Sequence, residues 1–145
     1  MLVSKDKIAK LIPHAGTMCL LDGVLYWDAS VIRCFTTSHR SVENPLFSDG
    51  CLHAVCGIEY AAQAMAVHGR LAGDVKERPQ IGYLASVREL ICHVDRLDTL
   101  PGDLFVEAEQ LLGDARRVIY QFKLRSEDAV VLSGRAAVVL LAGTA

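Results

Sequence analysis

The 145-residue sequence lacks three features that would each point to a particular class of protein. It has no apolar run of the ~18–20 residues that a membrane span requires, and its first twelve residues alternate charged with apolar side chains instead of forming a signal-peptide core. Its formal net charge is -2, with no Lys/Arg cluster of the kind that binds nucleic acid. We therefore expect a cytoplasmic protein with no membrane and no nucleic-acid partner.

Paired-cysteine motifs are also missing. The five cysteines are odd in number and scattered, and most have apolar neighbours, which favours reduced thiols over a disulfide framework. Cys51, His53 and Cys56 form a C-x-H-x-x-C cluster, but no second ligand pair follows at the spacing of a zinc finger. We expect neither a metal site nor another cofactor.

What the sequence does contain is enough apolar material for one core, since 52% of its residues are hydrophobic. Apolar periodicity and turn residues predict a short helix, a strand hairpin, a long helix and then three or four long strands. The expected helices cover residues 4–11 and 54–71, and the expected strands cover 19–27, 31–37, 80–94, 104–112, 118–125 and 130–142. This order predicts one α+β domain over residues 1–145, with a curved antiparallel sheet wrapped around the long central helix.

The central helix carries the most informative residues. Its segment AVCGIEYAAQAMAV, residues 54–67, is apolar apart from Glu59 and Gln63. A spacing of four residues places these two side chains on one helix face, one turn apart. A carboxylate among apolar side chains is usually paired, protonated or functional, because burial of an unpaired charge is costly. We expect Glu59 to be functional, with a purely structural carboxylate that is hydrogen-bonded across a dimer interface as the alternative. We expect Gln63 to orient either Glu59 or a backbone group.

Four segments resemble the hotdog-fold 3-hydroxyacyl-acyl carrier protein (ACP) dehydratases of type II fatty acid and polyketide synthesis. They are IPHAGTMCLLDGV (12–24), ENPLF (43–47), GIEYAAQA (57–64) and LPGD followed by LFVEAE (100–109). PHAG with the following methionine, and GIEY with AQA, further resemble dehydratase-like proteins of aryl polyene pigment pathways. The resemblance implies a hotdog fold and a homodimer or hotdog heterodimer. It also implies one continuous sheet around two long helices, with a tunnel for an ACP-bound acyl thioester at the dimer interface.

The resemblance also implies a reaction, the removal of water from a 3-hydroxyacyl thioester to give the trans-2-enoyl thioester. The family uses a histidine and a helix carboxylate, and Glu59 matches that carboxylate. The N-terminus of the helix, near residues 54–57, is expected to offer N–H groups to the thioester oxygen, with Gly57 allowing close approach. With Gly57, the resemblance places Gln63 and Phe47 in the substrate-binding region.

The histidine is missing from its usual place. The family carries it in a Gly-His-Phe-Pro motif after the loop that matches residues 43–47, where this chain has Asp49, Gly50 and Cys51. Three possibilities stay open: His53 as the base, which we favour, His14 as the base, or no catalytic histidine.

The remaining alternatives concern the role of the whole chain. It could be a non-catalytic hotdog subunit that pairs with an active dehydratase or binds an acyl chain, or it could be an acyl-thioester hydrolase. Cys51 or Cys56 as a nucleophile is disfavoured, because no base is placed beside either one by the sequence. His68 is expected to be a cation near the end of the central helix.

Overall fold

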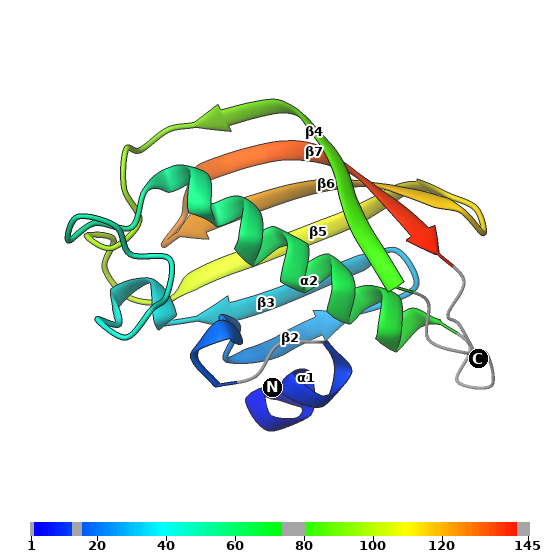
Figure 1. The fold of residues 1–145 in the computed structure, drawn as a ribbon, viewed down its shortest axis with the longest axis horizontal. Helices are drawn as coiled ribbons and strands as arrows, with labels where there is room; N and C mark the ends of the chain where they lie inside the picture. Colours follow the sequence, from blue (N-terminus) through cyan, green and yellow to red (C-terminus); the bar gives the residue numbers. More distant parts are fainter. Residues whose placement is uncertain (1, 13–15, 74–80, 142–145) are drawn as a thin grey trace.

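A computed structural model describes residues 2–12, 16–73 and 81–141 of the chain. Seven strands form one antiparallel sheet, in the order β1-β2-β3-β5-β6-β7-β4. The sheet curves around a long helix, α2, which crosses its concave side (Figure 1). The bounds are β1 Val3–Ser4, α1 Lys5–Leu11, β2 Gly23–Trp27, β3 Val31–Thr36, α2 Gly57–Ala72, β4 Ile81–Cys92, β5 Leu104–Gly113, β6 Arg117–Ser126 and β7 Ala129–Leu141. The predicted α+β architecture is confirmed.

Short local signals define several of the element boundaries. The side chain of Ser4 caps α1 by accepting a hydrogen bond from the Lys7 N–H at 3.4 Å. The Asp28 carboxylate accepts from the N–H groups of Ser30 and Val31, both at 2.9 Å, and so fixes the turn between β2 and β3. These hydrogen bonds hold the pKa of Asp28 down at about 2, with the Tyr26 hydroxyl as the largest contributor.

The sheet side of α2 forms the centre of the core. Tyr60, Ala61, Ala64 and Val67 are fully buried there, against the inward-facing residues of β5 and β6. The opposite stripe of the helix is open in the single chain, because Ala66 and Gly69 are exposed and Ala62 is only half-buried. The single chain therefore covers one side of α2 and leaves the other side partly exposed.

Strand β4 is the long edge of the sheet. It pairs with β7 on one side, and among residues 2–12, 16–73 and 81–141 no strand pairs with its other side. Several of its apolar side chains are exposed to solvent: Tyr83 is 54%, Leu84 41% and Ile91 51% exposed. A long edge strand with exposed apolar residues is a template for pairing with another chain.

Two further findings bear on the sequence predictions. The expected strand over residues 19–27 begins only at Gly23, since a 3-10 turn, η1 Gly16–Met18, precedes it and residues 19–22 are irregular. No helix in the described part of the chain is long and apolar enough to cross a membrane.

Candidate functional site

Glu59 lies in the first turn of α2, at the end of the helix that meets the loops. Its side chain is half-buried in the single chain, so the fully buried carboxylate expected from the apolar sequence is not observed. The difference arises because Glu59 lies beside the open stripe of α2 and not on the side that faces the sheet. Part of the Glu59 side chain is therefore exposed to solvent in the single chain.

Gln63, one turn further along, is 1% exposed and holds a backbone segment. Its side-chain oxygen accepts from the Leu20 N–H at 2.9 Å, and its side-chain nitrogen donates to the Met18 carbonyl at 2.7 Å. Orienting backbone groups is one of the two roles that the sequence predicted for Gln63. The amide fixes the segment that follows the PHAG motif against the helix that carries Glu59.

Tyr60 is a site residue that the sequence reasoning missed. Its hydroxyl lies 2.9 Å from the Ser38 hydroxyl and accepts from the Asn44 side-chain amide at 2.9 Å. The Ser38 hydroxyl in turn donates to the Leu20 carbonyl at 2.7 Å, and Asn44 also binds the Ser38 carbonyl at 2.9 Å. This buried network fixes the loop that contains half-buried Phe47 next to the N-terminal end of α2. A tyrosine beside Glu59 in an apolar helix was the signal available in the sequence.

His53 occupies the N-cap position of the 3-10 turn η3 Ala54–Cys56, which continues directly into α2, and its side chain makes no capping hydrogen bond. It is exposed, and it pairs with Arg96 in an isolated antiparallel bridge. The neighbouring Leu52 N–H donates to the Asp98 carboxylate at 3.0 Å, and the Arg96 guanidinium also binds that carboxylate. These contacts, led by the Arg96 hydrogen bond, hold the pKa of Asp98 well below its usual range. The chain segment that carries His53 is thus fixed to the segment after β4.

The N-terminus of the helix differs from the expected anion site. The N–H of Cys56 donates to the His53 carbonyl at 3.0 Å, the N–H of Ala54 donates to the Asp95 carbonyl at 3.0 Å, and the N–H of Gly57 donates within η3. Three of the four amides expected to face a thioester are therefore already bonded, two of them through the 3-10 turn and one to the segment after β4.

Gly57 has a packing role in the structure. A Cβ atom at this position would overlap the Leu132 side chain and would lie 3.0 Å from a methyl of Leu124. The missing side chain therefore lets α2 approach the sheet, whereas the sequence assigned the close approach to a ligand.

The other histidines occupy different settings. His14 lies outside the described residues, and His93 is exposed just after β4. His68 is fully buried, with Nδ1 2.7 Å from the Tyr120 hydroxyl and Nε2 2.9 Å from the Asp28 carbonyl. Since a carbonyl only accepts, Nε2 carries the proton and the Tyr120 hydroxyl donates to Nδ1. Burial lowers the pKa of His68, so the expected helix-end cation is instead a neutral buried residue.

The cysteine cluster is partly assembled. The Cys51 sulfur lies 3.8 Å from Nδ1 of His53, and burial raises the pKa of the Cys56 thiol. Within the ranges that the structure describes, no group of three or more His, Cys, Asp or Glu side chains could hold a metal ion.

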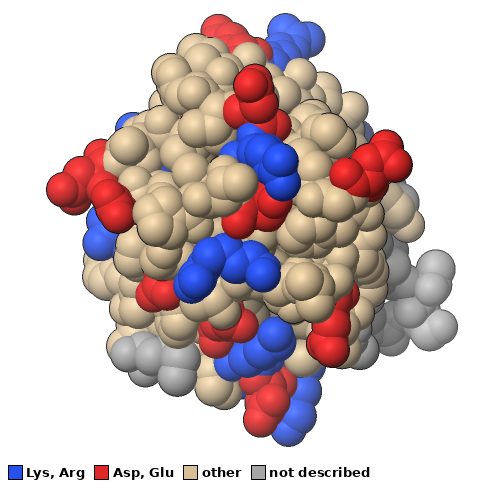
Figure 2. Space-filling model, turned by 90° about the vertical axis from the view of Figure 1, so that its left-hand side faces the viewer, with Lys and Arg blue, Asp and Glu red and all other residues tan. Residues whose placement is uncertain are grey.

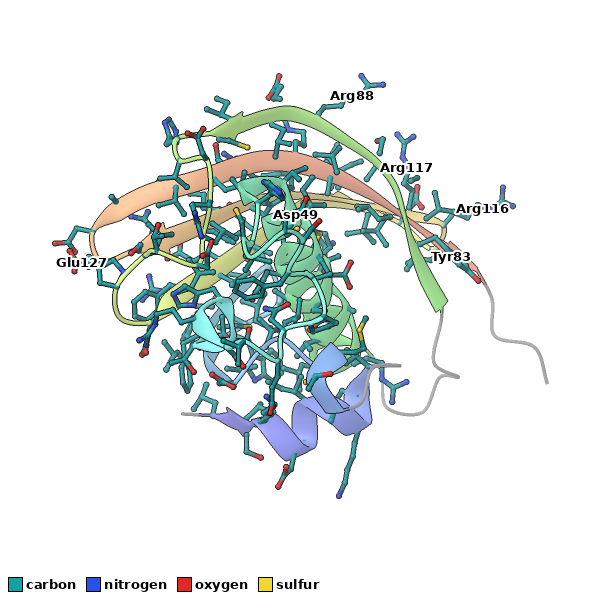
Figure 3. All side chains as sticks on the ribbon, turned by 60° about the vertical axis from the view of Figure 1, so that its left-hand side comes forward. Asp49, Tyr83, Arg88, Arg116, Arg117 and Glu127 are labelled. Atoms are coloured by element: carbon teal, nitrogen blue, oxygen red, sulfur yellow. The ribbon has the colours of Figure 1, made fainter. Side chains whose placement is uncertain are left out.

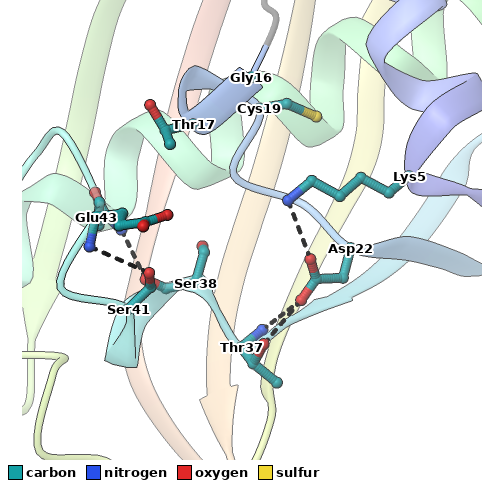
Figure 4. Close-up of a pocket in the computed structure, with 10 residues that line it drawn as sticks. Lys5, Gly16, Thr17, Cys19, Asp22, Thr37, Ser38, Ser41 and Glu43 are labelled. Atoms are coloured by element: carbon teal, nitrogen blue, oxygen red, sulfur yellow. Dashed lines mark hydrogen bonds and ion pairs between the residues drawn. The ribbon is translucent and has the colours of Figure 1, made fainter.

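A hollow of about 450 Å³ lies between η1, α1 and the loop after β3 (Figure 4). At its rim Lys5 lies 3.4 Å from the carboxylate of Asp22, which also accepts from the Thr37 N–H at 2.8 Å. Ser38 and Asn44 line it, so it borders the network of Tyr60, but Glu59 is not among its lining residues. Figure 2 shows acidic and basic side chains interspersed on the face at the loop end of the molecule.

Comparison with known families decides the classification. The model of the ApeP-like family, described as ApeP dehydratase, matches residues 6–142. The chain belongs to the ApeP-like dehydratase family. None of the curated proteins matches it in sequence.

Solved structures show a similar fold. The dehydratase heterocomplex ApeI:P from Xenorhabdus doucetiae matches with a TM-score of 0.80 and 24% identity, over 92% of this chain and 90% of that chain. A thioesterase from Haemophilus influenzae matches with a TM-score of 0.68 and 12% identity, over 98% of this chain and 96% of that chain. These likenesses confirm the hotdog fold predicted from the sequence.

Proposed function

We propose that this ApeP-like chain dehydrates a 3-hydroxyacyl thioester carried on ACP in fatty acid or polyketide-type synthesis. The observation that supports the proposal is Glu59, the one carboxylate of α2, which lies half-buried in the first turn of the helix. It stands at the position that matches the catalytic carboxylate of the hotdog dehydratases.

The reaction needs an acid and a base. A base takes a proton from C2 of the substrate, and an acid protonates the hydroxyl that leaves C3, so that water and the trans-2-enoyl thioester are formed. We assign the acid to Glu59. His53 is the favoured base because it lies at the start of the 3-10 turn that continues into α2, and its exposed ring is open to a substrate. His14 is the alternative base.

Substrate contacts follow from the same elements. Phe47 supplies an apolar side chain from the loop fixed by Asn44 and Tyr60. Gly57 and Gln63 act indirectly in this proposal, since Gly57 lets α2 pack closely on the sheet and Gln63 fixes the segment at Met18 and Leu20. They position Glu59 and do not themselves bind the acyl chain.

A second hotdog subunit completes the site in this proposal. The exposed stripe of α2 with Ala62, Ala66 and Gly69 lies on the side of the helix next to Glu59, and the outer edge of β4 is paired with no described strand. Small side chains let a partner helix approach closely, and pairing at β4 would satisfy the edge strand. The similar ApeI:P protein is a dehydratase heterocomplex, which supports a hotdog partner.

The test is an assay of the purified protein with 3-hydroxyacyl-ACP, followed by mass spectrometry for the loss of water. Glu59→Gln should lower the rate by about 10²–10⁴-fold, the usual contribution of a positioned acid. Glu127→Gln, an exposed acid in the turn between β6 and β7, is the matched control and should retain the rate. Equal rates for the wild type and Glu59→Gln would exclude the assigned role.

A non-catalytic hotdog subunit is the second candidate. It is favoured by the absence of the family's Gly-His-Phe-Pro histidine and by the unpaired edge of β4. Under this alternative the isolated chain is inactive, and His53→Ala leaves the activity of the assembled complex unchanged. Release of a free acid in the same assay would instead indicate an acyl-thioester hydrolase.

A further inference from the structure

Cys51 and His53 bring a thiol and an imidazole into contact just before α2. The Cys51 sulfur lies 3.8 Å from Nδ1 of His53, within hydrogen-bond reach for a sulfur atom. A neutral imidazole accepts at one ring nitrogen and donates at the other, so the thiol donates to Nδ1 when Nε2 carries the ring proton. The sequence placed no base beside Cys51, and the structure supplies one.

A tight turn fixes the backbone at Cys51. The Ser48 N–H donates to the Cys51 carbonyl at 2.9 Å, and the Cys51 N–H donates to the Ser48 carbonyl at 3.1 Å. Between them Asp49 and Gly50 have φ values of 53° and 74°, and a type I′ turn requires positive φ at both central positions. Asp49 lies in front of α2 in Figure 3, which turns the loop end of the molecule toward the viewer. The thiol is therefore carried by a defined turn at this end.

A short ladder fixes His53 to the segment after β4. Two backbone hydrogen bonds, of 3.0 Å and 2.8 Å, join residues 52–54 to residues 95–97 on either side of the bridge between His53 and Arg96. In an antiparallel pair of this kind the two opposed side chains lie on one face and come close together. The contact of Cys51 with His53 shows that the thiol shares this face.

Arg96 adds a cation to the same face. Its guanidinium donates to the carbonyl of Gly50, the residue before Cys51, at 3.3 Å. The pKa of Arg96 is raised, chiefly by its hydrogen bond to Asp98, and the charge of the Cys51 thiolate is a smaller contributor. A negative charge on the Cys51 sulfur would therefore have a cation nearby.

The other four cysteines lack this combination of base and access. Burial raises the pKa of the Cys19, Cys34 and Cys56 thiols, which lowers their share of the reactive thiolate. Cys92 is exposed, but within the described ranges its sulfur contacts no histidine ring. Cys51 is half-buried and has the imidazole of exposed His53 beside it. A nucleophile within reach of a base is the arrangement that covalent catalysis uses.

The chemistry of the thiol decides what it would react with. Oxidation of a thiol needs an oxidant, and a metal site needs a third ligand that the described residues do not provide here. Acyl transfer needs only a thioester, which is the substrate class of the proposed function. We propose that Cys51 accepts the acyl group of an acyl thioester, with His53 as its base. The proposal rests on the proposed function only in taking the ligand to be an acyl thioester.

The step exchanges one thioester for another. Nδ1 of His53 takes the thiol proton as the Cys51 sulfur attacks the carbonyl carbon of the donor. The bond between that carbon and the donor sulfur then breaks, and the leaving thiolate takes the proton back from His53. One C–S bond forms and one breaks, nothing is oxidised or reduced, and no other reactant is needed.

The experiment uses a thioester that cannot be dehydrated. The purified protein is incubated with hexanoyl-pantetheine, whose saturated chain has no 3-hydroxyl to lose as water. Mass spectrometry should show an added hexanoyl group, peptide mapping should place it on Cys51, and neutral hydroxylamine should remove it as it removes a thioester. Cys51 should be acylated at least about tenfold faster than Cys92, although Cys92 is more exposed. A failed dehydration assay and a failed acylation test are therefore separate results.

Matched variants separate the base from a structural role. His53→Gln should slow acylation of Cys51 by about 10²-fold near neutral pH and leave that of Cys92 unchanged. The effect should shrink as the pH is raised, because hydroxide then ionises the thiol without the histidine. Cys51→Ala should lose the adduct, and Cys92→Ala should keep it.

The wild-type comparison of the two thiols needs no variant to fold. Equal acylation of Cys51 and Cys92, or no adduct on Cys51, overturns the proposal. An adduct that forms on Cys51 as fast in folded His53→Gln as in the wild type also overturns it. So does an adduct that resists hydroxylamine, since this would indicate acylation of a lysine.

Discussion

Replacement of Gln63 by leucine tests whether the central helix fixes the segment after the PHAG motif. The substitution removes both side-chain hydrogen bonds, to the Leu20 N–H at 2.9 Å and to the Met18 carbonyl at 2.7 Å. Leucine is close to glutamine in volume, so the change leaves little cavity. The loss should therefore come from the two backbone groups that lose their partner at a site that is 1% exposed.

The magnitude follows from the cost of an unsatisfied buried polar group, which is about 1–3 kcal/mol each. The Leu20 N–H is fully buried and the Met18 carbonyl is partly buried. Their loss, partly offset by the burial of an apolar side chain, should lower the free energy of unfolding by ~2–4 kcal/mol. This is a large share of the ~5–15 kcal/mol that stabilises a typical domain. The melting temperature should fall by roughly 6–12 °C for a chain of this length.

Urea unfolding followed by circular dichroism at a fixed protein concentration measures the effect. Fixed concentration matters because association of subunits would raise the apparent stability. Gln121→Leu is the matched control, since it makes the same change at an exposed position of β6 and should alter stability by less than about 0.5 kcal/mol. The reasoning would be refuted if Gln63→Leu unfolded at the same urea concentration as the wild type, or if the control lost as much.

Three further predictions concern packing, pH and thiol reactivity. Gly57→Ala should destabilise the fold by about 1–3 kcal/mol, because the new methyl overlaps a leucine of β7. Gly69→Ala should stabilise α2 by ~0.5–1 kcal/mol, because no atom lies within 4 Å of the added Cβ. Thermal melts of the two variants and the wild type measure both effects. Burial lowers the pKa of His68 below its ordinary value of 6.5, so the unfolded chain binds more protons and the free energy of unfolding should fall as the pH drops below about 6.5. Urea midpoints between pH 8 and pH 5 should show this fall, and a smaller one in His68→Gln. Burial raises the pKa of Cys34 to about 12, so iodoacetamide at pH 8 should label exposed Cys92 in the native protein and Cys34 only after unfolding, as peptide mapping would reveal.

The fold was largely predictable because most of its boundaries depend on local chemistry. Ser4 at a helix start, Asp28 at a hairpin turn and Gly73 at a helix end each act through neighbouring backbone groups. The two-residue strand β1 was not predicted, since so short a segment has no periodicity to detect. The strand expected over residues 19–27 begins only at Gly23, as β2. Its predicted start was wrong because the backbone N–H of Leu20 bonds to the Gln63 side chain instead of to a neighbouring strand.

The candidate site was less predictable because its contacts join residues far apart in the sequence. The spacing of Glu59 and Gln63 indicated a shared helix face, but nothing local indicates that Tyr60 meets Ser38 and Asn44, which lie 22 and 16 positions earlier. His68 was misjudged for the same reason. Its partner Tyr120 is 52 positions away, and the burial that keeps the ring neutral is created only when the sheet closes over α2.

The hydroxyl of Tyr60 also limits how this protein can be re-engineered. Because it binds Ser38 and Asn44 at once, the loop after β3 cannot be replaced by the loop of another hotdog protein as an independent module. A graft that lacks the serine and the asparagine would leave a buried phenol without partners, one residue from Glu59. Loop grafts intended to change acyl-chain preference should therefore exchange the residue at position 60 together with the loop.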